Sequence, residues 1–326
     1  MTKDDLRIVF MGTPKFAVAT LRALVEGGYN VVAVVTQPDK PVGRHGSVLQ
    51  PSAVKQYACS LGLPVLQPVK MKDPGFVEQL RSFRANLQVV VAFRMLPEVV
   101  WDMPEYGTFN VHAALLPQYR GAAPINWAVI NGETRTGVTT FFLDHDIDTG
   151  RVIMREPFDI KPEYDAGDVY DGLMQLGAGV CLRTLEAIVA AGGHPEALPQ
   201  DGLQQPGEVL HAAPKIFKET CLIDWRKTAA GVRNFVRGLS PHPGAWTTLV
   251  TADGKRSVMK VYSTDAEIVK GQGEPGQLFR CGRKLAVTTA GGEAVVVDQM
   301  QVAGKKRMAS ADFLNGMKDI DGCRVE

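Results

Sequence analysis

The chain has few cysteines and no long apolar run, and each absence excludes a class of protein. Its five cysteines are odd in number, scattered and never in C-x-x-C spacing. This argues against a disulfide framework and against a cysteine-rich zinc site, and it fits a reducing compartment. No apolar run approaches the roughly eighteen residues that a membrane span needs, and the charged start MTKDDLR lacks the apolar core of a secretory signal. We therefore predict a cytoplasmic protein without a membrane partner.

The glycine fingerprint of dinucleotide-binding proteins is missing as well. The first apolar run, Leu6 to Met11, ends at Gly12, as such a fingerprint requires. The positions that should hold the next two glycines hold Pro14 and Ala17 instead. An oxidoreductase that uses a nicotinamide cofactor is therefore disfavoured.

The composition is that of an ordinary globular protein with an uneven distribution of charge. The 326 residues are 45% hydrophobic and 22% charged, which predicts two domains that each bury a core. Residues 1–214 hold 18 Lys and Arg against 23 Asp and Glu, a net of −5, whereas residues 215–326 hold 18 against 12, a net of +6. The basic C-terminal third favours an anionic partner, with nucleic acid the first candidate. A merely solvated basic surface is the alternative.

Apolar runs that alternate with helical patterns predict an α/β fold in the first part of the chain. The runs LRIVFM, VVAVVT and LQVVVAF have the continuous apolar character of buried parallel strands, so we expect a Rossmann-like, doubly wound parallel sheet over residues 1–191. Residues 192–208, rich in Gly, Pro and Gln, are predicted to be a linker. Short strand patterns with turns about every ten residues predict a small C-terminal β-barrel of the oligonucleotide-binding type over residues 209–326.

The candidate site lies between residues 109 and 150. Asn110 and His112 share one face of a predicted strand, because side chains alternate along a strand, and Asp148 lies in an acidic loop closed by Gly150. An amide and an imidazole faced by a carboxylate could carry out general acid–base chemistry on a carbonyl group. For an isolated Asn-x-His pair, a purely structural role is the more frequent alternative.

The acidic run at residues 144–148 also raises the question of a metal site. A calcium-binding loop that began at Asp144 would need glycine and glutamate at positions that hold Thr149 and Arg155. No other histidine or cysteine stands at ligand spacing. We therefore predict no bound metal and interpret most of this run as a solvated turn.

The stretch FNVHAALLPQYRGAAPINW at residues 109–127, together with the acidic loop, closely resembles the signature of the folate-dependent formyltransferases. The resemblance covers residues 5–320 or so, and is greatest to the branch that acts on initiator methionyl-tRNA. It implies that 10-formyltetrahydrofolate donates a formyl group to the amino group of that tRNA. It assigns catalysis to Asn110 as an oxyanion donor, His112 as a proton carrier, and Asp148 as the group that orients His112. It requires no covalent enzyme intermediate.

The same resemblance implies a folate site at the edge of the sheet. The implied contacts come from Phe93, Met95, Leu96, Ala114, Leu115, Leu116, Pro117 and Asp144. Two departures from the family pattern concern side chains rather than backbone. Phe93 and Arg94 replace a small or polar pair, and Ala114 replaces the serine of Ser-Leu-Leu-Pro.

A second set of residues is predicted to bind tRNA. The run VTQPDKPVGR resembles the family element that meets the acceptor stem, and it contributes Lys40 and Arg44. Lysines often follow in relatives, whereas this chain continues with His45, Gly46 and Ser47, and a solvated Arg44 is the alternative. In the basic C-terminal part the candidates for phosphate contacts are Arg233, Arg237, Lys305, Lys306 and Arg307.

Rival functions within the family share the catalytic trio. Formyltransferases that act on glycinamide ribonucleotide normally lack a C-terminal barrel. Enzymes that act on amino sugars, and the hydrolase part of formyltetrahydrofolate dehydrogenase, usually carry a further domain. An RNA-binding protein on an inactive formyltransferase scaffold is the rival from another class, and the joint presence of Asn110, His112 and Asp148 argues against it. We expect a monomer without an obligate protein partner.

Overall fold

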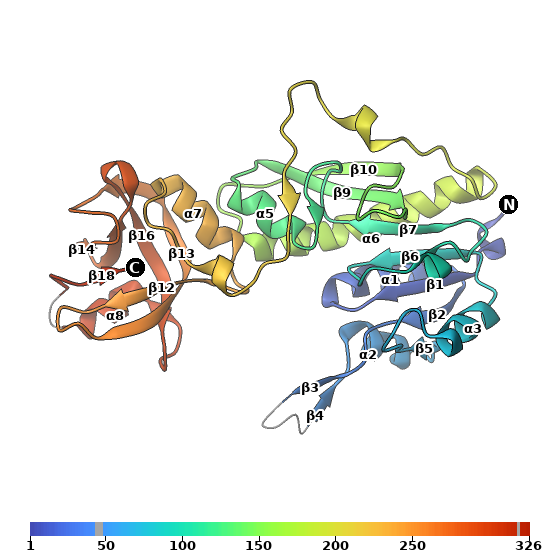
Figure 1. Ribbon diagram of the computed structural model, residues 1–326, viewed down its shortest axis with the longest axis horizontal. Helices are drawn as coiled ribbons and strands as arrows, with labels where there is room; N and C mark the ends of the chain where they lie inside the picture. The colour runs from blue at the N-terminus through green and yellow to red at the C-terminus, as the bar shows by residue number, and fades with distance from the viewer. Residues whose placement is uncertain (43–47, 318–319) are drawn as a thin grey trace. The chain divides into compact units, whose positions relative to one another are not determined.

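The computed structural model describes residues 1–42, 48–317 and 320–326, which form two compact units (Figure 1). The first unit consists of Met1–Gly121, Thr136–Phe158 and Tyr170–Ala212, and the second of Ala122–Arg135, Asp159–Val169 and Ala213–Glu326. The units are thus interleaved along the chain, whereas the predicted domains are continuous segments. Most notably, the predicted linker at 192–208 belongs to the first unit.

The first unit is built on a mixed seven-stranded sheet. In spatial order its strands are β10 (Val152–Asp159), β9 (Arg135–Phe142), β7 (Thr108–His112), β6 (Leu87–Val91), β1 (Ile8–Gly12), β2 (Val31–Val35) and β5 (Val65–Leu66). The strands from β7 to β5 are parallel, and β9 is antiparallel to β7. Strands β1 and β6 are buried along their whole length, as continuous apolar runs predict. The Rossmann-like fold class is therefore confirmed, with an antiparallel strand added beside β7.

Helices connect these strands, and their ends follow from local sequence. They are α1 (Lys15–Glu26), α2 (Ala53–Ser60), α3 (Pro74–Ser82), α4 (Glu98–Trp101) and α6 (Ala166–Ala190). Ser52 and Asp73 accept hydrogen bonds from backbone N–H groups in the first turns of α2 and α3, which stabilises those N-termini. Among the described helices, only α6 is long and apolar enough to cross a membrane, and half of its most apolar window is buried, as in a core helix.

The parallel register places the candidate site at one edge of the sheet. Val91 pairs with Val111, so β6 and β7 end side by side and the segments that follow them leave the same edge. Strand β2, which is parallel to β1, is followed along the chain by an antiparallel hairpin of β3 (Lys40–Val42) and β4 (Val48–Gln50). The sequence predicts only a polar loop there. The short strands β8 (Arg120–Gly121) and β11 (Ala212–Ala213) pair with each other, and η1 (Lys3–Asp5) and η3 (Gln200–Leu203) are single 3₁₀ turns.

The second unit contains a curled antiparallel sheet. Its strands, in spatial order, are β14 (Leu278–Cys281), β15 (Lys284–Thr288), β16 (Glu293–Val302), β13 (Arg256–Lys270), β12 (Ala245–Val250) and β18 (Arg324–Val325), while β17 (Met308–Ala309) pairs with β16. An antiparallel bridge between Gln277 and Arg324 joins the two edges. This arrangement confirms the predicted β-barrel as a curled, half-barrel sheet.

Helix α7 (Ala229–Gly238) packs on this sheet and on α5 (Pro124–Ile130) (Figure 1). The amphipathic α7 buries Val232 and Val236 in the core of the second unit, next to Trp225. Asn126 donates from Nδ2 to the carbonyl oxygen of Gly238 at 2.8 Å. Residues 122–135 therefore group with a part of the chain that follows a hundred residues later. The remaining short elements of this unit are η4 (Glu219–Cys221), η5 (Ala290–Gly292) and α8 (Ser310–Asn315).

Candidate active site

Asn110 and His112 lie on one face of β7, close to its carboxyl end. Asn110 is half-buried, and its Oδ1 atom is fully buried without a hydrogen-bond partner among the described residues. A buried polar atom without a partner costs on the order of 1–3 kcal/mol, so such an atom beside a binding site is expected to pair with a ligand. The Asn110 amide is therefore placed to bind a polar group of a substrate.

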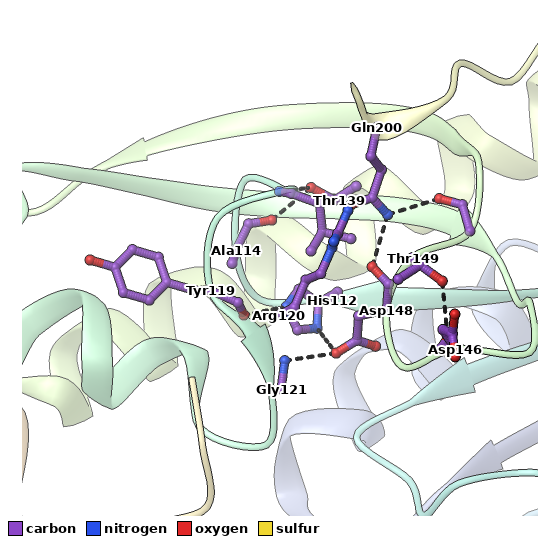
Figure 2. A network of polar contacts seen from close by, with 12 residues as sticks. His112, Ala114, Tyr119, Arg120, Gly121, Thr139, Asp146, Asp148, Thr149 and Gln200 are labelled. Atoms are coloured by element: carbon purple, nitrogen blue, oxygen red, sulfur yellow. Dashed lines mark hydrogen bonds and ion pairs between the residues drawn. The ribbon is translucent and has the colours of Figure 1, made fainter. Parts of the chain in front are cut away.

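His112 is held between a backbone carbonyl and a carboxylate (Figure 2). Its side chain is 6% exposed, its Nε2 lies 3.0 Å from the carbonyl oxygen of Tyr119, and its Nδ1 lies 3.8 Å from Oδ2 of Asp148. A carbonyl oxygen only accepts hydrogen bonds, so Nε2 carries a proton in this geometry. The other nitrogen, Nδ1, is then the one that can take up or release a proton in front of Asp148.

Asp148 is presented by the loop between β9 and β10. Its φ of +56° lies in the left-handed region, which is uncommon for a residue other than glycine. Its Oδ2 accepts a hydrogen bond of 2.9 Å from the backbone N–H of Gly121, and the side chain is 14% exposed. At Gly150 an added Cβ would lie 1.7 Å from the carbonyl oxygen of Phe142, so only glycine allows the loop to close onto β9 here. The loop therefore holds the carboxylate in one orientation.

The structure thus brings the three predicted catalytic residues together at the carboxyl edge of β7. An imidazole between a carboxylate and a carbonyl can accept a proton from one group and return it to another. The neighbouring amide can donate a hydrogen bond to an oxyanion, which is often the largest single electrostatic contribution to acyl transfer. These groups suit the transfer of an acyl group between two nitrogen atoms.

The segment that follows His112 is anchored by a threonine on β9. Thr139 donates from Oγ1 to the carbonyl oxygen of Ala114 at 2.7 Å and accepts from the N–H of Leu116 at 3.0 Å. Arg155 donates from Nη1 to the carbonyl oxygen of Leu116 at 2.8 Å. Thr139 and Arg155 thereby hold residues 114–116 in place beside the catalytic strand.

The predicted folate residues differ in accessibility. Ala114, Leu116, Leu96 and Pro117 are buried within the first unit. Phe93 and Leu115 are half-buried, whereas Met95 and Asp144 are exposed. The side chains that have surface available for a ligand are therefore those of the second group. The role of all eight in folate binding stays a prediction.

Arg94, a departure from the family pattern, turns away from solvent to bind backbone. Its guanidinium donates to the carbonyl oxygens of Pro68 and Val69, the latter at 2.9 Å. Burial lowers the pKa of Arg94 from its ordinary value, because desolvation disfavours the charged form. The bulky residue therefore ties the loop after β6 to the loop after β5.

The predicted tRNA-binding residues of α7 are engaged within the second unit. Arg233 donates from Nη2 to the carbonyl oxygen of Pro162 at 2.7 Å, and Arg237 donates from Nη1 to that of Tyr164 at 2.8 Å. Burial also lowers the pKa of Arg237. Both guanidinium groups retain further N–H donors, so their contact with RNA stays a prediction.

The other candidates for tRNA contacts are mostly exposed. Lys305, Lys306 and Arg307 lie in the turn between β16 and β17, and the guanidinium of Arg307 stands 4.4 Å from the centre of the Tyr262 ring. Lys40 is exposed on β3, and Arg44 lies outside the described residues. These side chains offer cationic groups to solvent.

Sequence reasoning missed several residues that hold the site together. Tyr119, Arg120 and Gly121 form the loop that faces His112 and Asp148, and Gln200 binds that loop from a segment eighty residues away. The resemblance covers the first three as part of a motif, but nothing in the local sequence distinguishes Gln200 from other glutamines. Within residues 1–42, 48–317 and 320–326, no cluster of three or more His, Cys, Asp or Glu could hold a metal ion.

Comparison with known proteins agrees with this geometry. Residues 6–185 match the formyl transferase family, and residues 215–318 match the formyl transferase C-terminal domain. The methionyl-tRNA formyltransferases of Parabacteroides distasonis and Phocaeicola vulgatus are 56% and 55% identical over 320 and 327 residues. These alignments cover 98% and 100% of this chain and the same shares of the two relatives.

A solved structure supports the fold independently. HypX from Aquifex aeolicus, solved in complex with tetrahydrofolic acid, superposes with a TM-score of 0.59 at 19% identity. The match covers 95% of this chain but 47% of HypX, so the chain spans about half the length of that protein. The family matches and the two relatives, which align over nearly their full length, show that the chain is an enzyme of the formyl transferase family and belongs among the methionyl-tRNA formyltransferases.

Proposed function

We propose that this protein transfers the formyl group of 10-formyltetrahydrofolate to the free amino group of initiator methionyl-tRNA. The observation that carries this proposal is that Nδ1 of His112 lies 3.8 Å from Oδ2 of Asp148, with the amide of Asn110 two residues away on the same face of β7. The names of the relatives supply the acceptor, the resemblance to the folate-dependent formyltransferases supplies the donor, and the geometry of the trio supports the chemistry.

The chemistry starts from a neutral amine. Its nitrogen attacks the formyl carbon, a carbon–nitrogen bond forms, and the carbonyl oxygen becomes an oxyanion that the amide of Asn110 stabilises by donating a hydrogen bond. His112 accepts the proton that the amine nitrogen loses, on Nδ1, and Asp148 stabilises the resulting imidazolium. The bond to the folate nitrogen then breaks, and that nitrogen takes up a proton from His112. No step requires a covalent bond to the protein.

The folate and the tRNA would occupy different surfaces of the chain. The half-buried Phe93 and Leu115, which flank the ends of β6 and β7, offer apolar surface for a pterin ring. The exposed lysines of the turn between β16 and β17 offer cations for phosphate groups. We further propose that the protein acts in the cytoplasm as a monomer, since translation initiation takes place there and the site is complete within one chain.

The test is transfer of radiolabelled formyl from 10-formyltetrahydrofolate to methionyl-tRNA, with initiator and elongator tRNAs in parallel at two salt concentrations. His112→Ala should lower kcat by about 10²–10⁴, the usual contribution of a general acid–base residue. His194→Ala is the matched control, because His194 is exposed and contacts the ring of Tyr106 rather than the trio. Labelling by the wild type should favour the initiator and weaken with salt.

Other outcomes would overturn parts of the proposal. Consumption of the folate without labelling of tRNA would show that a small amine or water accepts the formyl group. Binding of tRNA without consumption of the folate would show a binding protein on an inactive scaffold. A salt response that Lys305→Ala and Lys306→Ala leave unchanged would exclude this turn from the RNA contact.

A further inference from the structure

Gln200 is a buried amide whose polar atoms are all bonded to the region around Asp148. It is the first residue of η3, within the segment that joins α6 to β11, and it is 3% exposed. Its Nε2 donates to the carbonyl oxygens of Asp148 and Gly150, both at 2.8 Å. Its Oε1 accepts from Nε and Nη2 of Arg120 at 3.0 and 2.7 Å. Figure 2 shows this amide bridging the two loops.

One side of this bridge acts on the loop that carries Asp148. A non-glycine residue with a φ of +56° persists only where its surroundings hold it, because the left-handed region is sterically unfavourable. The side chain of Gln200 binds the backbone carbonyls of Asp148 and Gly150, the residues on either side of Thr149. These hydrogen bonds from another segment fix the backbone of this part of the loop. Gln200 thereby stabilises the backbone conformation that points the Asp148 carboxylate at His112.

The other side of the bridge acts on the loop that faces the trio. Three successive residues there have separate tasks: the carbonyl of Tyr119 binds His112, the guanidinium of Arg120 binds Gln200, and the N–H of Gly121 binds the Asp148 carboxylate. Gln200 is therefore linked to Asp148 twice, directly through the backbone and indirectly through Arg120 and its neighbour. A shift of Gln200 would move the carboxylate relative to the imidazole.

We propose that Gln200 is a positioning residue that sets the distance and orientation of Asp148 toward His112. This inference rests on the proposed function, because the rate it affects is that of formyl transfer. The segment between α6 and β11 would then be part of the active-site framework. Gln200 need not touch either substrate for this role.

The substitution that tests the proposal is Gln200→Glu. The glutamate keeps the size and the oxygen that accepts from Arg120, but it replaces the donating NH₂ by an oxygen that faces two carbonyl oxygens. We expect kcat to fall by about 10–100-fold, as for a catalytic group displaced by about 1 Å, with the KM values for folate and tRNA changed by less than about 3-fold. Gln204→Glu is the matched control, because the Gln204 side chain is exposed and donates to the carbonyl oxygen of Glu208 in the same segment, away from Asp148 and Arg120.

A cycle of double substitutions separates positioning from a general loss of structure. If Gln200 acts through Asp148, adding Gln200→Glu to Asp148→Ala should lower kcat by less than about 3-fold further. Three outcomes would overturn the proposal. Gln200→Glu could lower kcat in the Asp148→Ala background by the same factor as in the wild type, it could change KM alone, or it could have the same effect as Gln204→Glu. The dependence of kcat on pH should also change in Gln200→Glu but not in Gln204→Glu, because the former alters the environment of His112.

A second variant covers the case in which Gln200→Glu does not fold, as judged by its Tm. Arg120 is half-buried, so Arg120→Met removes the other half of the bridge at a more tolerant position. It should lower kcat by about 3–10-fold, and this loss should again vanish in the Asp148→Ala background. Wild-type transfer to methionyl-tRNA is measured first. If it is absent, the proposed function fails, whereas wild-type activity with multiplicative losses contradicts only the role of Gln200.

Discussion

Two parts of the first unit build one site from very different sequences: residues 109–121 together with 136–150, and residues 192–212. The first contains the proposed catalytic residues in a motif that is specific enough to be identified from sequence. The second contains residues 192–208, which are rich in Gly, Pro and Gln and are predicted to be a linker, yet it contributes a buried amide to the loop that carries Asp148. Reacting groups are restricted in residue type by their chemistry. A supporting group needs only a donor and an acceptor at the right distance, so many sequences can supply it.

The second segment is held along much of its length. A bridge joins Leu198 to Val152, and Gln118 donates from Nε2 to Glu208 and to the carbonyl oxygen of Val209 at 2.8 and 2.9 Å. The ring of His211 stacks on that of Tyr119 with 5.8 Å between centroids. Residues 198–211 are therefore fastened to the strands and loops of the site at several points. This comparison predicts that changes in the first segment cost catalytic rate, whereas changes in the second act through position or local stability.

The largest effect is expected at Asp148. Asp148→Asn keeps the size and an oxygen that can accept from Gly121, but it removes the charge that faces His112. We expect kcat to fall by about 10²–10⁴ with an unchanged Tm, measured by formyl transfer and by thermal unfolding. Asp146→Asn is a suitable control, because Asp146 is exposed in the same loop. Similar losses in both variants would mean that the loop as a whole, and not this carboxylate, supports the reaction.

A smaller effect is expected at Asn110. Asn110→Ala removes the amide that we assign to the oxyanion, and Oδ1 of this amide has no hydrogen-bond partner among the described residues that the substitution would leave unpaired. We expect kcat to fall by about 10²–10³ without loss of stability. Thr136→Ala is the matched control, because the buried Oγ1 of Thr136 likewise has no hydrogen-bond partner within the described part of the chain. A loss of affinity for folate with kcat unchanged would assign Asn110 to binding alone.

The smallest expected effect is a pH-dependent loss of local stability in residues 204–211. The hydrogen bonds from Gln118 and from the N–H of Gln205 hold the pKa of Glu208 below its ordinary value. A carboxylate whose folded pKa is depressed contributes stability above its unfolded pKa, and this contribution is lost as the pH falls through the folded pKa. Residues 204–211 should therefore exchange amide hydrogens faster, relative to the intrinsic rate, at pH 4 than at pH 6.

Glu208→Gln provides the control for this effect, because a neutral amide does not titrate in this range. The variant should show the same relative protection of residues 204–211 at both pH values. If the wild type and Glu208→Gln respond equally to pH, another group controls this segment. Amide exchange resolved by peptide distinguishes the two outcomes without reference to catalytic activity.

Much of the fold could be predicted from local patterns. The buried strands β1, β2 and β6 come from continuous apolar runs, and the starts of α2 and α3 follow from Ser52 and Asp73. The hairpin of β3 and β4 was not predicted, because its strands are short and exposed. Strand β13 is also longer than its apolar pattern predicts. Its second half is polar and is held by pairing with β16, with irregular register.

The sequence by itself determined the fold class and, through a specific motif, the family, and it supplied the prediction that Asn110, His112 and Asp148 form a catalytic trio. These follow from patterns within short stretches of chain, since residue type and spacing decide strand burial, helix ends and the available chemistry. Only the tertiary structure decided that residues 122–135 fold with α7, that Arg94 and Arg237 bind backbone carbonyls, and that Gln200 supports Asp148. The physical reason is that a hydrogen bond depends on distance in space. Gln200 meets Asp148 and Arg120 across 52 and 80 residues of chain, and no local pattern encodes such a meeting.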